Sequence, residues 1–74
     1  MDRIPALDGR EVVRLLQKAG FRVVSRRSSH VKMRRDDRIA IVPVHGSHPL
    51  KRSTLMGIFR DAGLRLDEVW ALLR

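Results

Sequence analysis

The fold is decided by residues 21–42, which read FRVVSRRSSHVKMRRDDRIAIV. Side chains here alternate with a period of two, in three runs separated by the polar connections 27–29 and 35–38. Such alternation is typical of β-strands, because successive side chains point to opposite faces of a sheet. Short connections join antiparallel neighbours. The stretch therefore predicts three short strands in a mostly antiparallel sheet, which ends where Pro43 stops the run.

A helical pattern precedes the strands. Asp8 and Glu11 resemble a capping box, with Asp in place of the usual Ser or Thr. Apolar residues then recur on one helical face, and Gly20 ends the pattern because glycine adopts the left-handed conformation without a Cβ clash. We place this helix at roughly residues 9–19.

Two helices are expected after the strands. Residues 43–52 are a loop, and the next apolar pattern predicts a helix that Ser53 or Thr54 caps and Gly63 ends. Asp67 then caps a short third helix. The order α-β-β-β-α, with this short C-terminal helix, predicts a two-layer α+β domain whose helices cover one face of the sheet.

Composition limits the class of protein. The 74 residues suffice for one domain, 1–74, and 43% of them are apolar, which is typical of a folded chain. Without cysteine there is neither a disulfide nor a thiolate metal site. The first residues lack the apolar run of a signal peptide, and no later segment is long enough to span a membrane. We therefore expect a cytoplasmic protein with no membrane partner.

The charge favours a polyanionic partner. Sixteen Lys and Arg against eight acidic residues give a formal net charge of +8, and thirteen of the cations are arginine. Residues 22–38 carry seven cations and two acids, a net +5, against +3 for the rest of the chain. Arginine presents a planar fork that matches phosphate oxygens in pairs, which favours nucleic acid. An acidic protein surface is the alternative partner.

Strand alternation makes His30 the best candidate for chemistry. If Val31 and Met33 face the helices, then His30, Lys32 and Arg34 face solvent together. Cations on such a surface bind phosphates, and an imidazole takes or gives a proton near neutral pH. The ribose 2′-hydroxyl is the obvious target, because its attack on the adjacent phosphorus cleaves RNA without a metal. An ordinary surface histidine beside basic residues is the alternative interpretation.

His45 and His48 lie in the loop after the third strand. Their spacing suits a metal ion, but the chain offers no convincing third ligand, and structural zinc usually needs four. We therefore expect no metal site and no cofactor, and we assign these histidines to the RNA surface or to solvent.

Four ordered motifs resemble a known family. They are the helix end Leu15-Leu16-Gln17-Lys18-Ala19-Gly20-Phe21, the pair Ser29-His30, Val42-Pro43 with His45, and Leu50-Lys51 followed by Thr54-Leu55, Ile58 and Ala62-Gly63-Leu64. In these motifs the chain resembles the HicA (YcfA-like) toxins of bacterial and archaeal toxin–antitoxin pairs. The resemblance covers nearly the whole chain.

The resemblance implies a fold similar to the double-stranded RNA-binding domain, and a ribonuclease that cleaves messenger RNA with one essential histidine, His30. It also implies a HicB-like antitoxin that covers the active surface, with operator DNA bound only through that partner. The RNA contacts that we expect are Arg26, Arg27, Ser28, Ser29, Lys32, Arg34, His45 and Lys51.

The chain departs from the family pattern at Ser28. The family usually has glycine there, and if that glycine is needed for a positive φ or a close RNA approach, Ser28 perturbs the turn. Two functions follow from the sequence: a metal-independent endoribonuclease toxin, and an RNA-binding module without chemistry of its own.

Overall fold

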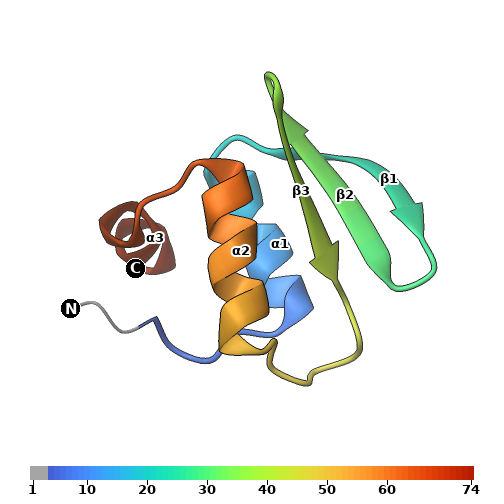
Figure 1. Cartoon of the computed structure of the whole chain (residues 1–74), viewed down its shortest axis with the longest axis horizontal. Coiled ribbons are helices and arrows are strands. Elements are labelled where there is room, and N and C mark those ends of the chain that lie inside the picture. Colours follow the sequence, from blue (N-terminus) through green and yellow to red (C-terminus); the bar gives the residue numbers. More distant parts are fainter. Residues whose placement is uncertain (1–3) are drawn as a thin grey trace.

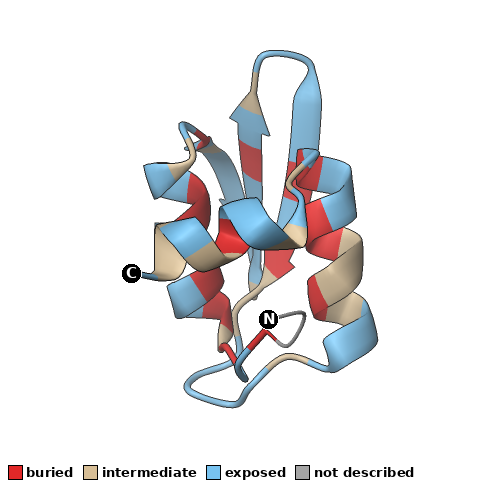
Figure 2. Ribbon diagram, turned by 90° about the vertical axis from the view of Figure 1, so that its left-hand side faces the viewer, coloured by how far each residue is buried: buried red, intermediate tan, exposed pale blue. Residues whose placement is uncertain are grey.

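The computed structural model describes residues 4–74, in which helices cover one face of a three-stranded sheet. The elements in chain order are α1 (Gly9–Lys18), β1 (Arg22–Arg27), β2 (His30–Arg35), β3 (Arg38–Pro43), α2 (Arg52–Ala62) and α3 (Leu66–Leu73). The strands lie in the order β1-β2-β3, and both pairs are antiparallel. Helices α1 and α2 lie side by side between α3 and the sheet (Figures 1 and 2). The predicted α-β-β-β-α order and the α+β class are confirmed.

The two turns between strands are tighter than expected. Strand pairing extends as far as Arg27 and Arg38, so the turns contain only residues 28–29 and 36–37. Each turn begins with a residue in the left-handed region, Ser28 or Asp36, both with φ of 57°. A positive φ at this position lets a two-residue turn follow the twist of the paired strands.

The ends of α1 and α2 follow the prediction. Gly20 (φ 96°) and Gly63 (φ 73°) take the left-handed conformation, and in each case the next residue donates its N–H to a carbonyl five residues back, at 2.9 Å. The capping box at the start of α1 is also present. Asp8 accepts from the Glu11 N–H, and Glu11 accepts from the Asp8 N–H, both at 2.9 Å.

The core lies between the sheet and the helices. Val31 and Met33 of β2 and the alternate residues Ala40 and Val42 of β3 are all 3% exposed or less. Figure 2 shows the buried positions on the sides of the helices and sheet that face one another. Ile41, by contrast, is 52% exposed, because it lies on the other face of β3. The sheet therefore has one covered face and one open face.

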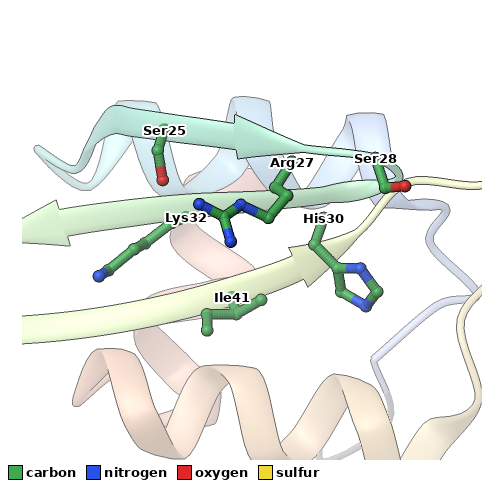
Figure 3. Close-up of a pocket in the computed structure, with 6 residues that line it drawn as sticks. All are labelled: Ser25, Arg27, Ser28, His30, Lys32 and Ile41. Atoms are coloured by element: carbon green, nitrogen blue, oxygen red, sulfur yellow. The ribbon is translucent and has the colours of Figure 1, made fainter.

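A bulge in β1 decides which of its side chains reach the open face. Val23 lies opposite Met33, but the next pairing joins Ser25 to Lys32, so that Val24 is an extra residue. The alternation expected for this strand therefore shifts by one after Val24. The shift brings Ser25 to the face that carries Lys32 (Figure 3).

The predicted caps of α2 and α3 are wrong. Helix α2 begins at Arg52, before Ser53 and Thr54, and Lys51 occupies its cap position without a side-chain hydrogen bond. Helix α3 begins at Leu66, so Asp67 lies within the first turn and does not cap it.

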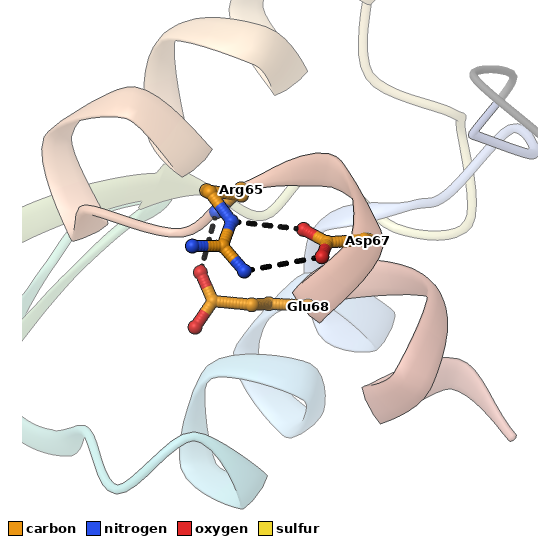
Figure 4. Close-up of polar contacts among 3 residues, drawn as sticks. All are labelled: Arg65, Asp67 and Glu68. Carbon is orange, nitrogen blue, oxygen red and sulfur yellow. Dashed lines mark hydrogen bonds and ion pairs between the residues drawn. The ribbon is translucent and has the colours of Figure 1, made fainter.

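Arg65 organises the start of α3. Its backbone N–H donates to Glu68 at 2.8 Å, and its guanidinium makes two 3.1 Å hydrogen bonds to the Asp67 carboxylate (Figure 4). These hydrogen bonds hold the pKa of Asp67 below its usual range. A carboxyl group whose pKa is lowered on folding stabilises the fold at pH values above its pKa in the unfolded chain. This contribution is lost as the pH falls through the pKa of the same group in the folded protein. Both side chains are well exposed, so the contribution to stability is small.

The helices are short. The longest, α2, has 11 residues, against about 20 for a helix that spans a bilayer. Within residues 4–74, no helix is both long and apolar enough to cross a membrane.

Candidate functional site

His30 lies on the open face of the sheet. It opens β2, and its neighbours across the sheet are Arg27 on β1 and Pro43 on β3. The exposed and buried residues of β2 alternate as expected, so that Lys32 and Arg34 lie on the same face as His30. The central strand therefore presents an imidazole and two cations in a row to solvent.

A hollow of about 660 Å³ surrounds this histidine. It is lined by Ser25, Arg27, Ser28, His30, Lys32 and Ile41, which come from all three strands and the first turn (Figure 3). None of these six residues carries a carboxylate. The hollow thus combines a proton-transfer group with two fixed positive charges, an arrangement that attracts a phosphate diester.

The bulge decides which of two adjacent arginines lies on the face of His30. Arg27 pairs with His30 and lines the hollow. Arg26 pairs with Val31, whose side chain is buried between the sheet and the helices. Residues directly opposite each other in an antiparallel sheet share a face. The structure therefore brings Arg27 to His30 and places Arg26 on the other side of the strand.

His45 lies beside His30, although the two are fifteen positions apart in the chain. The ring centroids are 6.3 Å apart, and the ring planes meet at 85°. Ser29 links the two segments, because its carbonyl accepts the Val44 N–H at 2.6 Å and its hydroxyl lies 3.5 Å from His45 Nε2. Ser29 and His45, both expected near RNA, thus belong to the immediate surroundings of His30.

Arg34 and Lys51, also expected to contact RNA, lie further from the hollow. The Arg34 guanidinium donates to the Asp36 carbonyl at 2.8 Å and lines a second hollow at the far end of β2. Lys51 lies at the start of α2, exposed to solvent. Arg34 extends the basic surface away from His30, and the structure does not bring Lys51 to the residues that line the hollow.

Ser25 and Ile41 line the hollow but are not among the site residues that the sequence predicts. Ser25 reaches the open face only because of the bulge. Ile41 belongs to a strand in which both alternating sets are apolar, so the pattern does not indicate which set is buried. Its position opposite Lys32 is set by the strand register.

Ser28 takes a left-handed conformation, with φ of 57°, that glycine adopts more easily. Replacing Ser28 by glycine should stabilise the fold by about 1 kcal/mol, because the Cβ clash of an L residue in this region disappears. Ser29→Gly is the matched control, since Ser29 does not have a positive φ and gains no such relief. Urea denaturation of the three proteins measures the difference. Equal or lower stability of Ser28→Gly would mean that the turn is not strained.

No cluster of three or more His, Cys, Asp or Glu side chains that could hold a metal ion occurs within residues 4–74. His45, which we considered as a metal ligand, lies beside Ser29 and His30.

Comparison with known protein families finds a match over most of the chain. A model that describes the HicA toxin of bacterial toxin–antitoxin pairs matches residues 9–64, which extend from the start of α1 to just past the end of α2. No protein with a curated description matches the chain.

Proposed function

The chain belongs to the HicA family of bacterial toxins, and from this premise we propose that it is an endoribonuclease that cleaves messenger RNA with His30, without a metal. The observation that carries the proposal is the position of His30 on an open, basic face, next to Arg27 and Lys32. Membership of the family also implies an antitoxin partner.

The proposed reaction needs only proton transfer and charge stabilisation. An RNA strand binds across the open face, with its phosphates near Arg27 and Lys32. His30 moves a proton while the 2′-oxygen attacks the adjacent phosphorus. The two cations stabilise the negative charge that develops on the phosphoryl oxygens. Because DNA lacks the 2′-hydroxyl, the reaction is restricted to RNA.

The direct test is incubation of the purified protein with single-stranded RNA in the presence of EDTA. We expect cleavage, since no step of the proposed reaction uses a metal. If RNA is recovered intact from a complex with the folded protein, the chain is an RNA-binding module, and the proposed activity is wrong.

The adjacent arginines provide a charge-matched test of the binding face. Arg27→Ala should reduce the slope of log affinity against log salt by roughly 0.7–1, as expected for one lost phosphate contact. Arg26→Ala removes the same charge from the other side of β1 and should change the slope less. Fluorescence anisotropy with a labelled RNA measures both slopes. Equal losses would show that net charge, and not the face, governs binding.

The antitoxin is proposed to be HicB-like and to cover the open face. This face is basic, and Ile39 and Ile41 are 38% and 52% exposed on it, so an acidic partner with an apolar centre suits it. Operator DNA would then be bound by the complex, through the antitoxin. We further propose that residues 1–74 act as one domain in the cytoplasm, where messenger RNA is translated.

A further inference from the structure

The proposed cleavage requires two proton transfers at two different oxygens. The 2′-hydroxyl must lose a proton as the O2′–P bond forms, and O5′ must gain one as the P–O5′ bond breaks. In an in-line displacement these oxygens lie on opposite sides of phosphorus. A single imidazole beside one of them is poorly placed to serve the other, so the site needs a second proton-transfer group.

The His45 imidazole is the proton-transfer group that the structure brings to His30. Pairing of β2 with β3 sets His30 opposite Pro43, and the chain then turns so that the His45 ring lies 6.3 Å from the His30 ring. The ring planes are nearly perpendicular, so the rings do not stack on one another. Hydrogen bonds to a reacting atom span about 2.6–3.2 Å. Two rings whose centroids lie 6.3 Å apart are therefore close enough for each to reach a different oxygen of one phosphodiester.

Local contacts hold His45 in this position. The Ser29 hydroxyl lies 3.5 Å from His45 Nε2, and the Ser29 carbonyl accepts the N–H of Val44. Because Ser29 directly precedes His30, the same residue ties the loop to the strand that carries the first histidine. His48, three residues further along the loop, is exposed and provides a natural comparison.

We propose that His30 and His45 form an acid–base pair, an inference that rests on the proposed ribonuclease function. The neutral ring of one histidine accepts the 2′-hydroxyl proton, and the protonated ring of the other donates to O5′. The products are a 2′,3′-cyclic phosphate and a 5′-hydroxyl. One ring ends protonated and the other neutral, so protons balance, and exchange with water restores the starting states. Arg27 and Lys32 stabilise the phosphorane between them.

The test uses a leaving group that needs no acid. An RNA oligonucleotide is prepared with sulfur in place of O5′ at a mapped cleavage site, because a thiolate departs without a proton. Wild type, His30→Ala, His45→Ala and the control His48→Ala are compared on this RNA and on the ordinary one. On ordinary RNA, His30→Ala and His45→Ala should each lose on the order of 100-fold or more in rate. His48→Ala should cleave like the wild type.

On the sulfur-containing RNA, one of the two impaired variants should recover most of the wild-type rate, and that histidine is the acid. The inference is overturned if His45→Ala cleaves ordinary RNA normally, or if neither variant recovers with the sulfur substrate. In both cases cleavage by the wild type would leave the ribonuclease function standing. Failure of the wild type to cleave ordinary RNA would instead overturn the function itself. Circular dichroism establishes that all four proteins are folded.

Discussion

Replacing His30 by alanine should lower the rate of RNA cleavage by roughly 10²–10⁴-fold, the usual contribution of a positioned proton-transfer group. The fold should survive, because His30 is exposed on the open face and contributes nothing to the core between sheet and helices. Single-turnover cleavage of a defined RNA gives the rate, and thermal denaturation tests the fold. The same variant, produced without an antitoxin, should no longer arrest bacterial growth.

His48→Ala is the matched control for this experiment. It removes an exposed imidazole from the same basic protein, and should leave both cleavage and growth arrest unchanged. A His30→Ala variant that cleaves at the wild-type rate would remove this histidine from the site. Equal losses in both variants would indicate a general effect of histidine removal.

The largest effect on stability is expected at Gly9. Gly9 is buried at the first position of α1, and a Cβ added there would collide with the Pro43 carbonyl oxygen and approach the Val44 Cα to 2.8 Å. Both obstacles are backbone atoms, so the helix must move away from the end of β3. Gly9→Ala should therefore cost about 3 kcal/mol, near the upper end for overpacking. In a domain of this size each kcal/mol lowers Tm by roughly 4–8 °C.

Gly57→Ala should have the opposite effect on the stability of the fold. Its Cβ would meet only the end of the Arg60 side chain, at 3.6 Å, inside helix α2. Alanine is the better helix former, so this variant should gain roughly 0.5–1 kcal/mol. Thermal and urea denaturation measure both changes. A Gly9→Ala protein as stable as the wild type would mean that α1 does not pack tightly against Pro43 and Val44.

The effect at Gly9 also bears on the site. The segment that Gly9 contacts leads directly into His45, so a displaced helix start shifts the loop that carries the second histidine. We therefore expect any folded fraction of Gly9→Ala to cleave RNA more slowly than the wild type.

Much of the fold follows from sequence because its signals are local. The period of two in 21–42, and the glycines that end α1 and α2, depend only on neighbouring residues. The predicted caps of α2 and α3, by contrast, are wrong, and α3 shows why. Asp67 has the chemistry of a cap, but its carboxylate binds the Arg65 side chain, and the helix begins at Leu66 with Arg65 at the cap position. Side-chain competition of this kind leaves no pattern in the sequence.

The site was harder to predict from the sequence than the fold, because it depends on the register of strand pairing. Val23 and Val24 are the same residue type, and nothing in their neighbourhood marks the extra residue that exchanges the faces of Arg26 and Arg27. The proximity of His45 to His30 likewise depends on which residue of β3 pairs with the start of β2. Long-range pairing determines these placements, and local propensity does not encode it.

We propose that the open face around His30 cleaves RNA through the 2′-hydroxyl of the substrate. Mass spectrometry of the fragments made by the wild-type protein in EDTA tests this most directly, with an RNA that carries a single 2′-deoxy nucleotide at a mapped site as comparison. We expect 2′,3′-cyclic phosphate and 5′-hydroxyl ends, and no cleavage at the deoxy position. Intact RNA after incubation with folded protein, or continued cleavage at the deoxy position, would show that the proposed reaction is wrong.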